Sequence, residues 1–169
     1  MVIKGMDKNA RDYIVRQWKE CGLINRIPGH QSSLSNIIRE MPSKARDHES
    51  VLHRTLLKEE KAIAIEIPLW DNNRKITGHS DLILIEDNKG KENIVICDYK
   101  TGSEDNFFKY IPQVALYGKM IEKLIPIADI TCYIYNEKGE WRFSPNLLNE
   151  ATQEVKKRNL PFNWKELID

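Results

Sequence analysis

The sequence of 169 residues predicts an α/β fold, in which helices flank a mixed central sheet that begins with a three-stranded antiparallel meander. Three observations predict it. Apolar residues recur at helical spacing before residue 60, β-branched and polar residues alternate from residue 61 to residue 102, and a further helix and strand follow. This order is typical of helices packed around one sheet.

The first of these observations concerns the helices. Tyr13, Ile14, Trp18 and Cys21 follow helical spacing, and Gly22 is a typical residue after a helix end. Five helices are expected from such patterns, over residues 7–21, 33–40, 43–60, 110–125 and 146–159. The segment "LINRIPGHQSS" between the first two is expected to be a loop, because polar residues, glycine and proline interrupt its apolar pattern.

The strands follow a period of two. The turns "DNNRK" and "NKGK" separate three β-branched runs, so these runs are expected to pair as an antiparallel meander. A fourth strand follows the crossover helix, and "GEWRF" extends it as a hairpin. The expected strands cover residues 61–70, 76–87, 92–102, 128–137 and 139–143.

Composition narrows the class of protein. Hydrophobic residues make up 41% and charged residues 30%, as in globular proteins, and no apolar run approaches the roughly 18 residues that span a bilayer. The N-terminus turns charged too early for a signal peptide, so a cytoplasmic, reducing location without membrane contact is expected. A net charge of +1 means that any nucleic-acid contact needs a local basic patch or metal ions.

An acid and a base end one predicted strand, as Asp98 and Lys100 in "NIVICDYKTG". Side chains alternate along a strand, so these two share one face and Tyr99 takes the other. Burying a carboxylate and an ammonium is costly unless they pair or bind something. The pair is therefore either a buried ion pair or half of an active site, and spacing alone does not decide between them.

A second carboxylate is expected beside the first. Folding the meander at its turns places Asp81 opposite Cys97 or Asp98, and Glu66 close to His79. Two adjacent carboxylates stay ionised together only if a cation lies between them. Magnesium and manganese accept carboxylate ligands and complete their shell with water and phosphate, so a phosphodiesterase site is one interpretation.

Two helices add candidate site residues. Gln113 and Tyr117 are four apart on one helix face and suit hydrogen bonds to a phosphate or base, although Tyr117 also fits helix packing on the sheet. Glycine at Gly78 allows close approach of a ligand to the backbone. The helix before the sheet adds His48, Glu49 and His53 in "DHESVLHRTL", which are potential metal ligands or ordinary surface residues.

Taken in order, "VLHRTL", "GHSDLILIE", "IVICDYKTG" and "QVALYGKMI" resemble the RecB-type branch of the PD-(D/E)xK nucleases, which includes CRISPR-associated RecB-like exonucleases. The similarity spans about residues 43–135. It implies a restriction-endonuclease-like core and a metal-dependent nuclease that hydrolyses DNA, with single strands or DNA ends as substrate. The alternative is a non-catalytic nucleic-acid-binding or assembly module on the same fold.

The resemblance implies roles for individual residues. Asp81 and Asp98 would bind Mg or Mn, helped by the main chain of Asp98 or of Tyr99, and Lys100 would be the catalytic lysine. The histidine of the family pattern would be His53. Other implied roles concern the substrate contacts Gln113 and Tyr117, the alternative ligands His48 and Glu49, and the supporting residue Glu66.

The resemblance also implies features outside the site. CRISPR-associated members hold an iron–sulfur cluster through one early and three late cysteines. Here Cys21 is early but no late trio exists, so no such cluster is expected. DNA is the expected partner, and a helicase or recombination partner would be a separate protein. One nuclease domain over residues 1–169 is expected, with a helical extension (1–42), a catalytic core (43–136) and a C-terminal hairpin and helix (137–169).

Overall fold

The computed structural model describes residues 8–72, 75–88, 90–126, 128–147 and 149. Its helical elements are α1 (Lys8–Glu20), η1 (Gly29–Gln31), α2 (Ser33–Arg39), η2 (Ser43–Ala45), α3 (His48–Lys58), η3 (Glu104–Tyr110) and α4 (Ile111–Leu124). Its strands are β1 (Ile24–Pro28), β2 (Ala62–Asp71), β3 (Ile76–Asn88), β4 (Lys91–Tyr99), β5 (Asp129–Asn136) and β6 (Gly139–Phe143). Most of the helix expected over residues 146–159 lies outside the described residues.

The strands form one six-stranded sheet in the order β1-β6-β5-β4-β3-β2. β2, β3 and β4 pair antiparallel as the expected meander, and α4 then carries the chain back so that β5 pairs parallel with β4. A parallel neighbour requires such a crossover connection. The sequence prediction of a mixed sheet begun by a meander is therefore confirmed.

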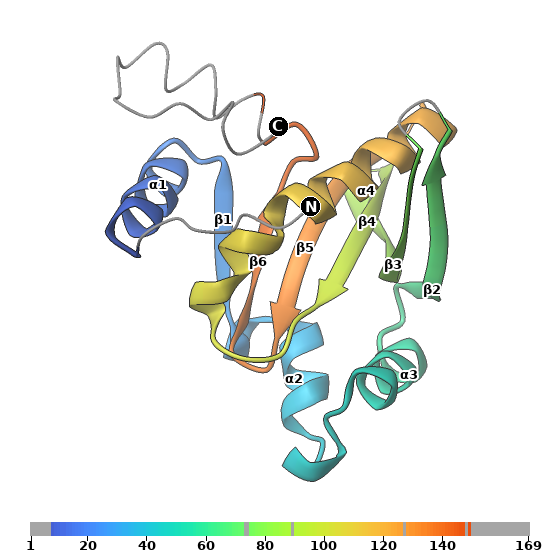
Figure 1. Cartoon of the computed structure of the whole chain (residues 1–169). Coiled ribbons are helices and arrows are strands. Elements are labelled where there is room, and N and C mark those ends of the chain that lie inside the picture. The colour runs from blue at the N-terminus through green and yellow to red at the C-terminus, as the bar shows by residue number, and fades with distance from the viewer. Residues whose placement is uncertain (1–7, 73–74, 89, 127, 148, 150–169) are drawn as a thin grey trace.

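Helices cover both faces of this sheet (Figure 1). α4 runs across the front, packing on β2 to β5, and α1 lies beside β1. α2 and α3 lie together at the other end of the molecule and pack through Leu34, Ile38, Val51 and Leu52 on the opposite face. Among the helices described, none is long and apolar enough to cross a membrane.

The N-terminal part is more closely integrated than expected. Residues 24–28 form the edge strand β1, antiparallel to β6, where a loop was predicted. Trp18 from α1 and Ile24 from β1 belong to the buried core of the front face. The loop prediction was wrong because pairing with β6 compensates for the weak strand pattern of this segment, whose Pro28 stands at the strand end, where proline is tolerated.

Helix ends follow local capping chemistry. Ser32 caps α2 by accepting a hydrogen bond from the Ser35 backbone N–H at 3.0 Å, and Asp47 caps α3 by accepting one from Ser50 at 2.9 Å. The second cap makes α3 begin at His48, later than the expected start at residue 43, where only a short 3₁₀ turn forms. This cap determines where His48 lies.

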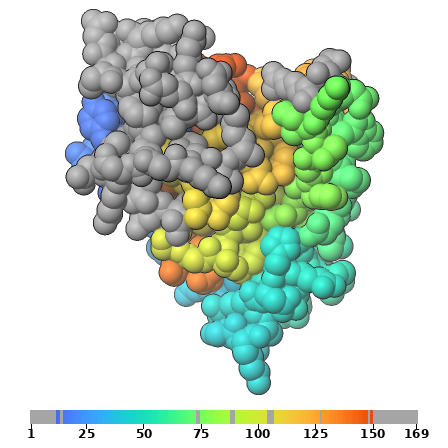
Figure 2. All heavy atoms as spheres, in the orientation of Figure 1, coloured from blue at the N-terminus to red at the C-terminus, as the bar shows by residue number. Residues whose placement is uncertain are grey.

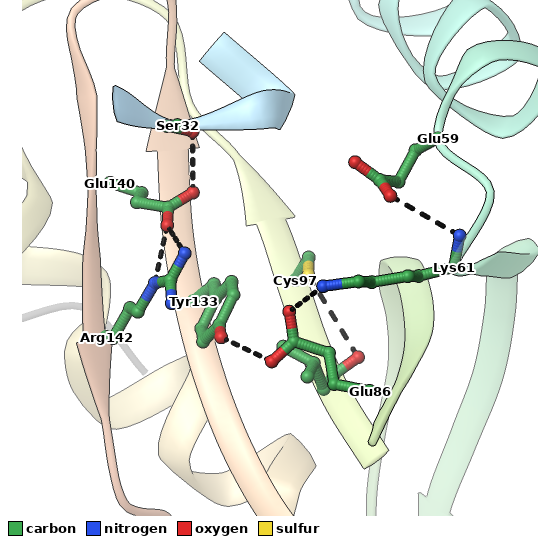
Figure 3. Close-up of polar contacts among 9 residues, drawn as sticks. Ser32, Glu59, Lys61, Glu86, Cys97, Tyr133, Glu140 and Arg142 are labelled. Atoms are coloured by element: carbon green, nitrogen blue, oxygen red, sulfur yellow. Dashed lines mark hydrogen bonds and ion pairs between the residues drawn. The ribbon is translucent and has the colours of Figure 1, made fainter. Parts of the chain in front are cut away.

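Charged side chains line the sheet face that α2 and α3 pack against (Figure 3). The Glu140 carboxylate, almost fully buried, accepts from the Arg142 guanidinium, which lies over the Tyr133 ring at 4.5 Å. The Tyr133 hydroxyl donates to Glu86 at 3.0 Å, and Lys61 pairs with Glu86 at 3.3 Å. These contacts compensate for burying ionised groups beside the core.

Candidate active site

Asp81 lies where the β3–β4 ladder ends. Its last antiparallel pair is Leu82 with Cys97, so Asp81 and Asp98 are the next residues on the two strands. There the Asp81 carboxylate Oδ2 accepts the Tyr99 backbone N–H at 2.8 Å. The Asp81 carboxylate therefore takes the place of a backbone carbonyl as the acceptor for the Tyr99 N–H. This hydrogen bond fixes the carboxylate between the strand ends.

Beside Asp81, strand β2 has an irregularity that changes which side chains face each side of the sheet. Ile65 packs on the α2/α3 face and Ile67 on the α4 face, although residues two apart on a strand normally share a face. Glu66 between them has φ 52°, an uncommon conformation for a residue with a Cβ. Because Ile65 pairs with Leu82, Glu66 lies across from Asp81 rather than beside His79, so the expected register was wrong by two residues.

His48 approaches both carboxylates from the first turn of α3. Its Nε2 lies 3.1 Å from Asp81 Oδ2, and its Nδ1 lies 3.6 Å from Glu66 Oε1. One ligand atom from each of the three residues lies within 4.8 Å of the other two. The Tyr99 ring, 6.0 Å from the imidazole between centroids, packs beside His48. An imidazole and two carboxylates thus converge on one point.

Asp98 and Lys100 form the second part of the site. Lys100 Nζ lies 2.6 Å from Asp98 Oδ2, and the Asp98 side chain is about 2% exposed. Burial, and then repulsion by the Asp81 charge, raise the pKa of Asp98 to about 6 even though Lys100 opposes the shift. The two carboxylates therefore repel each other across the strand ends.

The charge on Lys100 is set by the same neighbours. Burial alone lowers the pKa of Lys100, but the Asp98 and Asp81 carboxylates outweigh it, so the pKa is raised above its ordinary value. The Lys100 ammonium also lies 5.0 Å from the centre of the Tyr110 ring. Lys100 is therefore a charged hydrogen-bond donor at neutral pH.

Gln113 and Tyr117 lie on α4 over strand β3. Gln113 Nε2 donates to the Tyr117 hydroxyl at 2.7 Å. The Tyr117 ring covers Gly78 so closely that a Cβ there would lie 2.5 Å from its hydroxyl oxygen. Tyr117 is also largely buried with Met120 and Ile121, so its packing and its polar contact coexist.

The structure does not bring His53 to the carboxylates. His53 is exposed and lies 3.8 Å from Glu49 on its own helix, so neither of these candidates joins the group around Asp81. The structure therefore places His48, and not His53, beside the Asp81 and Glu66 carboxylates. Three or four positions make one helical turn, so His48 shares the face of the buried Val51 and Leu52, while His53 points away.

Sequence reasoning left part of this site undecided or unassigned. Glu66 was expected only as a supporting residue on the neighbouring strand, and its position depends on the irregular backbone of β2 at that residue, which no local pattern predicts. His48 had a usable signal, namely its spacing of three and four residues before Val51 and Leu52. Tyr110, which faces Lys100, had no signal.

The donor set fits a divalent cation. Two carboxylates and an imidazole are common ligands of divalent metal ions, and carboxylates suit magnesium and manganese. The buried Asp98 carboxylate with its raised pKa adds negative charge that a cation would offset. Cys97 and Cys132 are buried in the sheet, on opposite faces, and neither belongs to this group.

A mixed sheet whose strand ends carry paired carboxylates, a lysine two residues further and a metal-type ligand group defines a metal-dependent nuclease. Comparison with known families agrees with this class. A family model described as the PD-(D/E)XK nuclease superfamily matches residues 4–167. The chain therefore belongs to the PD-(D/E)XK nuclease superfamily, and its fold is the restriction-endonuclease-like fold of that superfamily. A search of curated proteins finds no match.

Proposed function

We propose that this protein is a Mg- or Mn-dependent deoxyribonuclease of the RecB-type branch, acting on single-stranded DNA or DNA ends. The observation that carries the proposal is the convergence of Asp81, Asp98 and Lys100 at the adjacent ends of β3 and β4. The "DYK" motif followed by Gln113 and Tyr117 on the next helix supports the branch.

Asp81 would be the central metal ligand, with Asp98, His48 and the main chain at Tyr99 around it. Glu66 would be a further ligand or would orient His48, which it faces at 3.6 Å. A bound divalent ion supplies a more acidic water and stabilises charge on the phosphate. The Tyr99 N–H holds Asp81 in place, so the Asp81 carboxylate needs no rearrangement to bind.

Lys100 would hold a non-bridging phosphate oxygen or orient the attacking water. The raised pKa keeps its ammonium charged, which favours donation of hydrogen bonds over proton abstraction in this arrangement. Charge-assisted donation to developing negative charge is among the larger contributions to catalysis. Gln113 and Tyr117, on the adjacent helix face, would contact the nucleic-acid backbone.

We also propose that the enzyme works without an iron–sulfur cluster and in a reducing compartment. The burial of Cys97 and Cys132 on opposite sheet faces supports this, because cluster ligands must converge. A helicase or recombination protein would be a separate partner. One nuclease domain over residues 1–169 is proposed.

The test uses labelled single-stranded DNA, double-stranded DNA and RNA with Mg, with Mn and with EDTA. Cleavage is expected with metal only, and preferentially on single strands or ends. Asp81→Asn and Lys100→Ala should each lower kcat by about 10²- to 10⁴-fold. Lys91→Ala is the matched control, because Lys91 lies at the opposite end of β4.

The outcomes separate the alternatives. Cleavage by Asp81→Asn and Lys100→Ala at the parent rate would overturn the assignment of the site. Binding of DNA without turnover under any metal would instead indicate a non-catalytic module. Faster cleavage of RNA than of DNA would agree with the assigned active site but would contradict DNA as the substrate.

A further inference from the structure

Two lysine ammonium groups lie near the ring of Tyr110, next to the candidate active site. Lys100 Nζ and Lys109 Nζ each lie 5.0 Å from the centre of the Tyr110 ring. Cations are attracted to an aromatic face at this distance. The two ammonium groups can therefore be no further apart than twice that distance.

Lys109 differs from the other lysines near α4. Lys119 pairs with Glu122 at 2.5 Å, and Lys123 pairs with Asp71 at 2.6 Å. Within the described part of the chain, no carboxylate lies within ion-pair distance of Lys109, and its contact is with the Tyr110 ring. Among the described side chains, the positive charge of Lys109 is therefore offset by the Tyr110 ring and by no carboxylate.

The segment that carries Lys109 is well anchored. η3 is fixed in the core by Phe107 and Phe108, both almost fully buried. η3 ends at Tyr110, directly before α4 begins, and Lys109 and Tyr110 are half-buried. In Figure 2, yellow-green atoms of the chain that follows β4 lie beside the teal atoms that include α3.

We propose that Lys109, held on the Tyr110 ring, binds the phosphate next to the scissile phosphate and so makes the site selective for polynucleotides. This rests on the proposed nuclease function, in which Lys100 faces the scissile phosphate. A strand carries one phosphate charge for about every 3.4 Å of duplex axis. Two ammonium groups that each lie 5.0 Å from one ring centre are near enough to each other to contact neighbouring phosphates of one strand. Tyr110 sets their spacing.

The shared ring explains why the two cations tolerate each other. Like charges repel, but each ammonium gains attraction from the aromatic face, and the Asp98 carboxylate offsets the charge of Lys100. A strand with consecutive phosphates would neutralise both. A substrate with a single phosphodiester and no flanking phosphate would engage Lys100 alone.

The first experiment measures binding, independently of catalysis. Fluorescence anisotropy of a labelled 12-nucleotide single strand in EDTA compares the parent with Lys109→Ala, Lys109→Arg and the control Lys91→Ala. Lys109→Ala should raise Kd by about tenfold and flatten the salt dependence by about one phosphate contact. Lys109→Arg should stay within twofold of the parent, because it keeps the charge. An equal effect of Lys91→Ala would overturn the proposal.

The second experiment measures selectivity with Mg or Mn. The substrates are a dinucleoside monophosphate, which has only the scissile phosphate, and the same dinucleotide with a terminal phosphate on either side. Lys109→Ala should raise KM about tenfold for one of the phosphorylated dinucleotides and leave KM for the unphosphorylated one unchanged, with kcat unchanged. An equal loss on every substrate would overturn the subsite.

The Tyr110 ring is tested by a conservative pair. Tyr110→Phe keeps the aromatic face and should retain both constants, whereas Tyr110→Leu should raise KM for the phosphorylated substrate and lower kcat, because both lysines lose their support. If Tyr110→Leu behaves as the parent, the ring does not position the two lysines.

The proposed nuclease function and the role of Lys109 can fail separately. If the parent shows no metal-dependent cleavage, the nuclease function is refuted, while the anisotropy result still decides the role of Lys109.

Discussion

At the scale of single residues, the site depends on which histidine faces the carboxylates. His48 lies 3.1 Å from Asp81, whereas His53 lies on the exposed side of α3 with Glu49. The two histidines are five positions apart on one helix. The same substitution can therefore be made beside the carboxylates and on the exposed side of the helix. Their contrast gives the first prediction.

His48→Ala should weaken Mn binding and lower kcat/KM by about tenfold to a hundredfold, because a member of the proposed metal site is lost. His53→Ala should leave both within a factor of two. Isothermal titration of Mn into the metal-free protein, combined with DNA cleavage rates, measures the difference. The assignment of His48 fails if His53→Ala is the more damaging variant.

Asp98 gives a prediction about stability and pH. Its pKa in the folded protein is raised from 3.8 to about 6, so the folded state holds the proton more tightly than the unfolded state. The resulting stabilisation is complete below about pH 4 and is lost as pH rises through 6. In the metal-free protein above that range, the ionised carboxylate costs on the order of 3 kcal/mol.

Asp98→Asn should therefore raise the free energy of unfolding by about 2–3 kcal/mol at pH 7.5 in EDTA, because asparagine does not ionise. The difference from the parent should disappear near pH 4.5. Urea denaturation at both pH values measures it, with Asp87→Asn, at an exposed position near the end of β3, as control. Equal stability of parent and Asp98→Asn at pH 7.5 would contradict the burial argument.

At the scale of elements, the fit between α4 and β3 is decided at one glycine. Gly78 has no side chain where the Tyr117 ring lies, and a Cβ there would meet two ring carbons and the hydroxyl oxygen of Tyr117 at 2.5–2.7 Å. Real Cβ atoms do not approach so closely, so the ring would have to move. Its hydrogen bond from Gln113 would then be lost.

Gly78→Ala should therefore destabilise the protein by about 1–3 kcal/mol and lower nuclease activity. The cost of this substitution should shrink in a Tyr117→Leu background, where the ring is absent. A double-mutant cycle by chemical denaturation measures the coupling. If Gly78→Ala costs the same in both backgrounds, contact with the Tyr117 ring is not its cause.

At the scale of the whole molecule, the N-terminal segment is part of the fold. β1 completes the sheet beside β6, and α2 contributes Leu34 and Ile38 to the core that also holds Leu52. Removing residues 1–42 would expose that core and the β6 edge. We therefore expect the N-terminal segment to be needed for folding.

A truncated chain that begins at residue 43 should lose cooperative unfolding, because each deleted large core side chain costs about 2–5 kcal/mol and the loss of several exceeds typical stability. Circular dichroism during thermal unfolding measures this against the full chain. A single sharp transition in the truncated chain would show that residues 43–169 fold alone and that the N-terminal segment is accessory.

Much of the fold was predictable because its signals are local. Turns between β-branched runs fixed the meander, and the second turn brought Asp81 opposite Asp98 to within one residue. The first turn did not place Glu66 correctly, because β2 turns over there at φ 52°. β1 was missed because its strand character comes from pairing with β6 rather than from its own pattern.

The sequence by itself determined the order of α3, the meander, the crossover helix and the strand after it, together with the carboxylate–lysine group at the strand ends, because alternation and turn chemistry act over a few residues. Only the tertiary structure decided that His48 and Glu66 meet Asp81, and that Lys109 and Lys100 share the Tyr110 ring. Those contacts join α3, the β2 turn-over and η3, whose relative positions depend on how the whole core packs.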